Sequence, residues 1–226
     1  MNYDNVIKGE FISRPNRFIA YVKIDGKTEI AHVKNTGRCK ELFIPGAALY
    51  LQKSNNPARK TKYDVIAVEK GNRIINIDSQ IPNKVFEEFL RKSEFLGKID
   101  YIKPECFYKK SRFDFYLESG KRKIFVEVKG VTLEEDNIVR FPDAPTERGV
   151  KHLNELSDAV KNGYGAFVIF VVQMSGVDRF EPNRATHPDF ADALRNAVEN
   201  GVKAYAFECD VNFEHITIEK EIKVCI

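Results

Sequence analysis

Alternating apolar and polar residues mark the first third of the chain and predict short strands joined by turns. Asp25-Gly26 and Gly71-Asn72 stand between apolar runs and indicate two tight hairpins. No stretch of this region has the period of a long helix. The expected strands cover residues 6–13, 17–24, 28–33, 48–53, 65–70 and 73–78. Five or six strands in so short a segment predict a small barrel.

Helical spacing of the apolar residues begins in the next part of the chain. It covers residues 85–90, and we expect Asn83 to cap this helix, which runs to about residue 95. A second helix is expected after Pro145 and ends at Gly163. A third is expected over residues 189–200.

Strands are expected between and after these helices. The run GAFVIFVV at 165–172 is almost wholly apolar, as in a central strand that is buried on both faces. The other expected strands cover residues 101–108, 113–117, 123–129, 203–208 and 213–218. This order predicts a mixed sheet flanked by helices. We therefore expect an α+β chain of two domains, a barrel over residues 1–80 and a mixed α/β domain over residues 81–226.

Composition narrows the class of protein. The 226 residues are 43% hydrophobic and 31% charged, which is typical of a globular protein. The chain has no apolar run of about 18 residues, and its first ten residues lack the pattern of a signal peptide. We therefore expect a cytoplasmic protein with no membrane segment. Its four cysteines are dispersed without C-x-x-C spacing, which indicates reduced thiols rather than a zinc site or disulfides.

Charge is distributed unevenly along the chain. Residues 1–80 hold 14 Lys and Arg against 8 Asp and Glu, whereas residues 81–226 hold 22 against 25. This asymmetry suggests that the first domain binds a polyanion and that the second contains a reactive site built from carboxylates.

Basic residues recur in three connections of the predicted barrel. Loops are ordinarily polar, so any one cluster alone is more often a solvated surface. Their recurrence in a segment that resembles an OB-fold, a barrel that often binds nucleic acid, favours contacts with phosphate. The candidate DNA-binding residues in these connections are Arg14, Arg17, Lys34, Arg38, Arg59, Lys60 and Lys62.

Two neighbouring strands of the second domain carry the candidate chemistry. Strand alternation puts Glu127 and Lys129 on one face, while Val128 turns toward the core. A Ser-Gly turn signal at residues 118–123 predicts a hairpin that brings Asp114 beside Glu127. Two carboxylates, with the carbonyl of Val128, suit Mg²⁺ or Mn²⁺, which prefer oxygen ligands.

Lys129 is expected to orient or help deprotonate a water that attacks phosphorus and to offset the developing charge. Glu-x-Lys on a strand is more often a solvated charge pair, but an acid in a buried strand is costly unless it is paired or coordinated. Glu88, on the helix after Asn83, is either a surface charge or a third carboxylate of the site.

Further cations lie near these acids in the sequence. Arg148 and Lys151 occupy the start of the second helix, where free backbone N–H groups favour anions, and either could hold a substrate phosphate. Capping and ion pairing by Glu147 and Arg148 is an equally good interpretation. Arg112, two residues before Asp114, could guide a duplex toward the acids. A lone His152 on this helix is more often structural than catalytic.

The chain resembles the SfsA family of sugar fermentation stimulation proteins over nearly its whole length. Asp114 with Glu127-Val128-Lys129 also resembles the PD-(D/E)xK nuclease-like superfamily, with Phe113 where that pattern has Pro and Gly130 where SfsA-like sequences often have Ser. The segments that carry the SfsA resemblance are Asn35-Thr36-Gly37, RFDF at 112–115, VEVKGVTL at 126–133, FPDAPTERGVKHL at 141–153 and FVVQ at 170–173.

This resemblance implies an N-terminal OB-fold joined to a nuclease-like domain. It also implies DNA binding without strong sequence preference and a regulatory role in bacterial sugar metabolism. By the same matching, Glu88 falls on the family's helix glutamate.

Two functions remain open at this point. One is a Mg²⁺-dependent nuclease with Asp114, Glu127, Lys129 and Glu88 as its catalytic residues. The other is a DNA-binding regulator whose nuclease-like domain does not cut. A carbohydrate-binding barrel is a third reading, which the basic loops disfavour. The sequence leaves the oligomeric state open, a dimer included.

Overall fold

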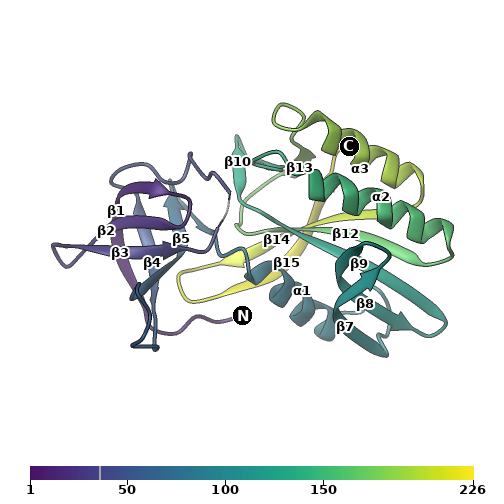
Figure 1. Cartoon of the computed structure of the whole chain (residues 1–226), viewed down its shortest axis with the longest axis horizontal. Helices are drawn as coiled ribbons and strands as arrows, with labels where there is room; N and C mark the ends of the chain where they lie inside the picture. The colour runs from purple at the N-terminus through teal and green to yellow at the C-terminus, as the bar shows by residue number, and fades with distance from the viewer. Residues whose placement is uncertain (36) are drawn as a thin grey trace.

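The chain folds into a barrel followed by a larger α/β domain (Figure 1). The computed structural model describes residues 1–35 and 37–226. Thr36, part of one segment of the family resemblance, lies outside the described residues.

All six predicted strands are present: β1 to β5 form the closed barrel, and β6 pairs with β5 beside it. They run in the order β3-β2-β1-β4-β5-β6, and a parallel pairing of β3 with β5 closes the sheet on itself. Both predicted hairpins are confirmed, since Asp25 and Gly26 have φ of 49° and 78° and Gly71 has φ of 61°. The strands are β1 (Val6–Asn16), β2 (Ile19–Ile24), β3 (Lys27–Val33), β4 (Ala48–Lys53), β5 (Tyr63–Lys70) and β6 (Arg73–Asn76).

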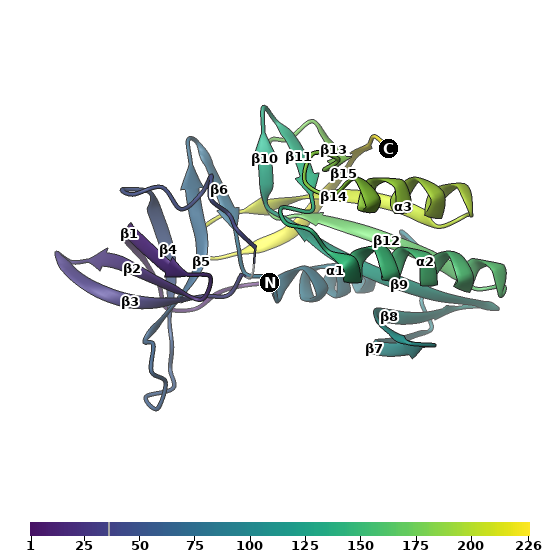
Figure 2. The same ribbon diagram turned by 45° about the horizontal axis from the view of Figure 1, so that its top comes forward.

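The second domain is a nine-stranded mixed sheet in the order β10-β11-β13-β15-β14-β12-β9-β8-β7. Helix α1 lies on one face, and α2 and α3 lie on the other (Figures 1 and 2). The elements are α1 (Ile81–Lys92), β7 (Tyr101–Tyr108), β8 (Ser111–Ser119), β9 (Arg122–Val131), β10 (Leu133–Glu135), β11 (Ile138–Phe141), α2 (Glu147–Lys161), β12 (Gly165–Val172), β13 (Arg179–Pro182), α3 (Pro188–Glu199), β14 (Lys203–Val211) and β15 (Ile216–Val224).

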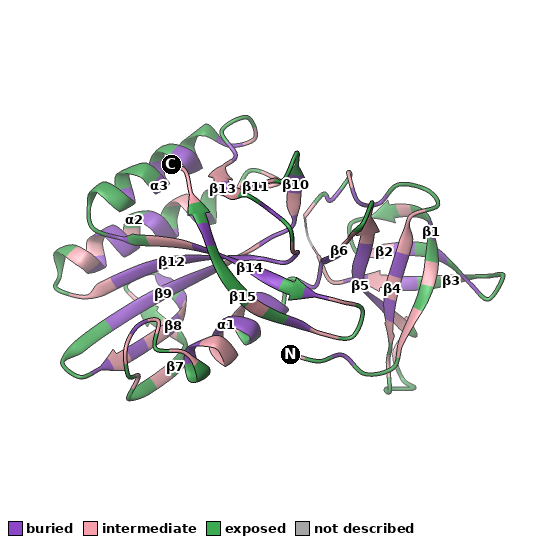
Figure 3. Ribbon diagram, turned by 180° about the vertical axis from the view of Figure 1, so that it is seen from behind, coloured by how far each residue is buried: buried purple, intermediate pink, exposed green. Residues whose placement is uncertain are grey.

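Strand β12 forms the centre of the core, as its apolar run predicts (Figure 3). Phe170 packs on the side of α2 and α3, whereas Ile169 packs on the side of α1. Its neighbours β9 and β14 run parallel to it. Both faces of the sheet are therefore covered where the candidate strand β9 lies.

The predicted cap of α1 is wrong. The helix begins at Ile81 after Gln80 and ends at Lys92, so Asn83 lies inside its first turn. Pro82 suits this turn because it has no N–H to leave unpaired. The amide of Asn83 is thus free to donate to a side chain outside the helix.

Three short strands were not predicted from the sequence. They are β10, β11 and β13, of three or four residues each. Segments of this length show too few alternations to reveal a period, and only their pairing with β15 and with one another defines them.

A buried polar network joins the two domains. Asn76, at the end of β6, donates through Nδ2 to the Tyr3 hydroxyl at 2.8 Å. Gln173, which follows β12 and is 1% exposed, donates through Nε2 to Asn76 Oδ1 at 2.8 Å and to the Asp78 carbonyl at 3.1 Å. Polar groups that are buried and paired in this way fix one arrangement of the domains.

Two further expectations concern the whole chain. Within the described ranges, no helix has the length and apolar character needed to cross a membrane. All four cysteines are free, as predicted, and burial raises the pKa of the Cys39 thiol to about 12.

Candidate active site

The candidate site forms where the β8–β9 ladder opens. The two strands pair from Ser119 opposite Arg122 up to Phe115 opposite Val126. Beyond that point, the Val128 N–H donates to Asp114 Oδ2 at 2.7 Å. Because the N–H and C=O of a residue in a strand point to the same side, the Val128 carbonyl also faces Asp114.

Helix α1 fixes the other oxygen of Asp114. Asn83 Nδ2 donates to Asp114 Oδ1 at 2.8 Å. Both oxygens of this half-buried carboxylate are therefore held by named donors, and Asp114 sits at the open end of the ladder in a defined orientation.

Glu127 lies almost wholly inside the protein, with 3% of its surface exposed. Its Oε1 contacts Lys129 Nζ, which confirms that the two side chains share a face of β9. Its Oε2 is buried and has no hydrogen-bond partner among the described residues. The structure thus brings together Asp114, Glu127 and Lys129, as the predicted hairpin and strand alternation require.

His152, interpreted from the sequence as more often structural than catalytic, is a further member of this cluster. Its Nδ1 lies 2.5 Å from Glu127 Oε1, and the side chain is 4% exposed. Arg148 Nε donates to His152 Nε2 at 3.3 Å, so Nε2 is the acceptor and Nδ1 carries the hydrogen toward Glu127. Arg148, His152 and Glu127 form a continuous hydrogen-bonded line from α2 to β9.

The charges of the two acids affect each other. Burial and the nearby Glu127 charge raise the pKa of Asp114, although the Val128 N–H, Lys129 and Asn83 partly offset them. Burial also acts to raise the pKa of Glu127, but Lys129 and His152 outweigh it, and the net pKa lies below the usual value. Glu127 is thus the more stable anion, whereas burial and the neighbouring Glu127 charge disfavour the ionised form of Asp114.

These residues fit a hard divalent cation in part. Within the described ranges, no group of three His, Cys, Asp or Glu side chains is arranged to hold a metal. The protein therefore offers two carboxylates, one with an unpartnered oxygen, and the Val128 carbonyl. Such a small set of oxygens suits Mg²⁺, which keeps several of its waters when it binds.

The structure does not bring Glu88 into this cluster. Its carboxylate binds the N-terminal ammonium of Met1 at 2.8 Å, and its side chain is 45% exposed. Asn83, which does reach Asp114, lies five residues earlier on α1. At about 100° per residue, five residues turn a side chain by about 140°, so Glu88 points to a different side of the helix.

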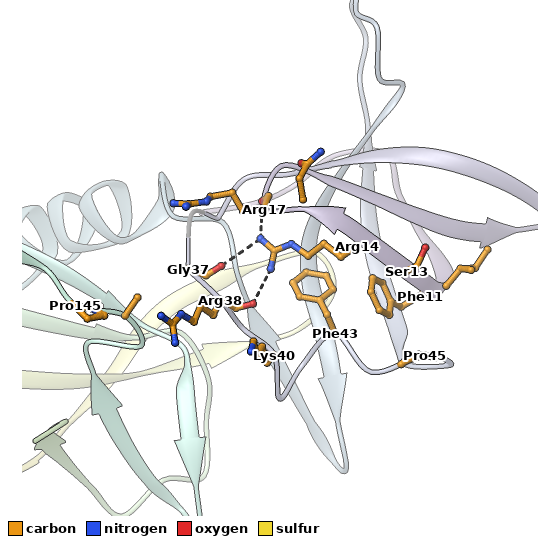
Figure 4. Close-up of a pocket in the computed structure, with 13 residues that line it drawn as sticks. Phe11, Ser13, Arg14, Arg17, Gly37, Arg38, Lys40, Phe43, Pro45 and Pro145 are labelled. Carbon is orange, nitrogen blue, oxygen red and sulfur yellow. Dashed lines mark hydrogen bonds between the residues drawn. The ribbon is translucent and has the colours of Figure 1, made fainter. Parts of the chain in front are cut away.

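Three of the predicted DNA-binding cations of the barrel are engaged inside the protein. Arg14 donates to the carbonyls of Arg17 and Arg38 at 2.6 and 2.9 Å, and its guanidinium lies 4.6 Å from the centre of the Phe43 ring (Figure 4). Arg59 forms a bidentate pair with buried Asp64 at 2.6 and 2.8 Å.

Lys34 is the third of these engaged cations. Its Nζ lies 3.3 Å from Asp64 and 3.4 Å from Asp78. Arg14, Arg59 and Lys34 therefore hold the barrel together before they meet any ligand.

Other predicted cations are exposed. Arg17 and Arg38 line a hollow of about 720 Å³ between β1 and the loop that precedes α2, together with Lys40 (Figure 4). Lys60 and Lys62 are exposed in the connection from β4 to β5.

The predicted cations of the second domain lie close to one another. Arg112, Arg148 and Lys151 line one cavity beside His152. Arg112 lies 3.4 Å from Glu105, and Lys151 Nζ donates to the Lys110 carbonyl at 2.9 Å. Thr146, and not Glu147, caps α2 by accepting from the Gly149 N–H at 3.1 Å.

Comparison with known proteins agrees with this arrangement. Residues 80–215 match the family described as "Sugar fermentation stimulation protein RE domain", and residues 12–77 match "SfsA N-terminal OB domain". The chain belongs to the SfsA family. This membership confirms the predicted family and the predicted order of an OB-like barrel before a mixed α/β domain.

Relatives of this SfsA chain match it from end to end. It is 58% identical to the sugar fermentation stimulation protein homolog of Clostridium beijerinckii over 226 residues, which is 100% of both chains. It is 59% identical to the homolog of Desulfitobacterium hafniense over 216 residues, 96% of this chain and 94% of that one. It also resembles a solved structure described as SfsA of Pyrococcus furiosus in complex with Ca²⁺, with a TM-score of 0.91, 32% identity and coverage of 100% and 98%.

Proposed function

We propose that this SfsA protein binds DNA and cleaves phosphodiester bonds with Mg²⁺ or Mn²⁺ at a nuclease-like site of the PD-(D/E)xK type. The observation that carries the proposal is the meeting of Asp114, Glu127 and Lys129 at the open end of the β8–β9 ladder, where one buried oxygen of Glu127 has no partner among the residues that the structure describes. Two neighbouring buried acids cost stability unless a proton or a cation relieves them, so their presence together favours a cation.

Each residue of the site has a distinct role in this proposal. Asp114, Glu127 Oε2 and the Val128 carbonyl would hold the cation, which would polarise the phosphodiester and lower the pKa of a water. Lys129 would orient the attacking water and offset negative charge that develops on phosphate. His152 restricts the rotation of the Glu127 carboxylate through its bond to Oε1.

The Ca²⁺ complex of the Pyrococcus furiosus relative supports the divalent part of this proposal. Ca²⁺ and Mg²⁺ are both hard cations that take oxygen ligands.

DNA would be held by the exposed cations rather than by the engaged ones. Arg17, Arg38 and Lys40 surround the hollow at the barrel, and Arg112, Arg148 and Lys151 lie near the acids. Lys and Arg that contact phosphates bind DNA with little sequence preference, and the affinity falls with salt. Because bacterial DNA lies in the cytoplasm, the proposed activity belongs there.

A second candidate is a DNA-binding regulator that does not cut. It is favoured by the double engagement of Glu127 Oε1, which both Lys129 and His152 already contact. Because Lys129 is paired with Glu127, its amine is engaged within the protein. A group of charged residues such as this can exist without catalysing a reaction.

The experiment that separates these candidates uses purified protein with labelled DNA and RNA in Mg²⁺, Mn²⁺ or EDTA. Cleavage that requires the metal is the expected result. Tight, salt-sensitive binding without cleavage in either metal would select the regulator. Absence of both binding and cleavage at low salt would overturn the proposal.

A further inference from the structure

A cavity of about 510 Å³ lies beside the proposed site, between the β7–β8 hairpin and the first turns of α2. His152, which contacts Glu127, forms part of its wall, so one side chain separates the cavity from Glu127. The lining residues are Phe107, Lys110, Ser111, Arg112, Glu147, Arg148, Lys151 and His152.

The charge of this cavity suits an anion. Four of its lining residues are cations, and its one carboxylate, Glu147, has a side chain that is 91% exposed. Arg148 donates to His152 through Nε only, and its two Nη groups make no hydrogen bond or ion pair with the described residues. The guanidinium therefore keeps the pair of donors with which arginine binds a phosphate.

Phe107 gives the cavity an aromatic wall. It is 72% exposed, which is the largest exposure of any large hydrophobic residue among those described. It lies on the edge strand β7 directly opposite Arg112 of β8. A single exposed aromatic is ordinary on a protein surface, but this one stands among cations at the mouth of a cavity. An exposed aromatic face beside phosphate-binding cations is how single-stranded nucleic acid is bound.

We propose that this cavity binds an unpaired nucleotide, with its base stacked on Phe107 and its phosphate at Arg148 and Lys151. This inference rests on the proposed function and names its substrate class, a nucleic acid with a single-stranded end or an unpaired stretch. In a continuous duplex the faces of the bases are covered by their neighbours, and Phe107 has no base to stack on. The unpaired nucleotide would lie next to His152 and hence next to Glu127.

Fluorescence anisotropy with two labelled oligonucleotides of equal length, one single-stranded and one a blunt duplex, tests this inference in EDTA, where nothing is cut. Phe107→Ala should weaken binding of the single strand roughly 5- to 140-fold, which corresponds to the loss of one base–aromatic stack. Binding of the blunt duplex should stay within about twofold of the wild-type value, since the cations remain. Phe107→Tyr keeps the ring and should bind as the wild type does.

Tyr101→Ala is the matched control. Tyr101 is 50% exposed on the same strand but lies outside the cavity. It should leave both affinities unchanged.

An unchanged affinity of Phe107→Ala for the single strand would overturn the inference, as would an equal loss for both oligonucleotides. If either result is found while the wild-type protein binds the duplex, or cuts it when Mg²⁺ is added, the proposed function still stands. A wild type that binds neither oligonucleotide at low salt would overturn both.

Discussion

Adding one methyl group at Gly130 should destabilise the whole protein, because this position lies between the candidate site and the domain junction. Gly130 follows Lys129 on β9. A Cβ placed there would lie 2.5 Å from Gln173 Oε1 and 2.7 Å from Pro82 Cγ. Neither neighbour can retreat easily, since Pro82 is part of α1 and Gln173 is held by Asn76 and Asp78.

The size of the effect follows from these contacts. Overpacking a dense core costs about 1–3 kcal/mol. If Gln173 moves away instead, two buried hydrogen bonds are lost at about 1 kcal/mol each. Gly130→Ala should therefore lower the free energy of unfolding by about 1–3 kcal/mol. At about 2–4 °C per kcal/mol for a chain of this size, Tm should fall by roughly 2–12 °C.

Thermal unfolding followed by circular dichroism measures this shift. Gly165→Ala is the control, because Gly165 begins the neighbouring strand β12 and the three atoms nearest to its added Cβ would all belong to the side chain of Ile124, the nearest at 3.1 Å. It should change Tm by no more than about 2 °C, which corresponds to about 0.5–1 kcal/mol. If Gly130→Ala has the same Tm as the wild type, or if the two variants lose the same stability, Gly130 is not closely packed against Gln173 and Pro82.

Three further predictions concern the metal, the acids and the barrel. Mg²⁺ or Mn²⁺ at about 100 times Kd should stabilise the fold by about 2.7 kcal/mol, which is a rise in Tm of roughly 5–10 °C. Asp114→Asn should abolish this rise, and an equal rise in the variant would mean that the metal binds elsewhere. The pKa of Glu127 is lowered in the folded state, so its carboxylate stabilises the protein above the unfolded pKa of 4.5 and this contribution is lost as the pH falls further. Denaturant unfolding at pH 7 and below pH 4.5 should accordingly show wild type more stable than Glu127→Gln at pH 7 and a smaller difference in acid, and a difference that grows in acid would contradict this sign. The double variant Arg17→Ala with Arg38→Ala should weaken duplex binding at low salt and reduce the slope of log affinity against log salt concentration by about 2. Arg59→Ala should instead cost about 1–3 kcal/mol of stability and leave DNA affinity nearly unchanged. The reverse pattern would mean that Arg59 is the DNA contact.

Much of the fold was accessible from the sequence because local patterns determined it. The two-residue turn at Gly120 and the alternation along β9 were sufficient to bring Asp114 beside Glu127. The apolar run of β12 likewise identified the central strand. The short strands β10, β11 and β13 were missed because pairing, and not periodicity, defines them.

The rest of the site depends on tertiary contacts that no local pattern contains. His152 reaches Glu127 across 25 positions of sequence, and its spacing of four from Arg148 was the only signal of their contact. Likewise, nothing in the basic loop sequences distinguishes the engaged Arg14 from the exposed Arg17. That difference comes from tertiary contacts, since the Arg14 guanidinium lies over the Phe43 ring and donates to the carbonyl of Arg38, whereas Arg17 is exposed.

If Lys129 serves a cutting reaction at Asp114 and Glu127, single-turnover cleavage of bound, labelled DNA should differ between wild type and Lys129→Ala. Lys123→Ala is the matched control, an exposed lysine on the same strand. We expect metal-dependent cleavage by wild type and by Lys123→Ala. A folded Lys129→Ala should still bind DNA but cleave it at least about 100-fold more slowly. Cleavage by Lys129→Ala at the wild-type rate would show that the lysine does not serve the reaction, and tight binding by a wild type that cuts in neither Mg²⁺ nor Mn²⁺ would show that the site does not cut.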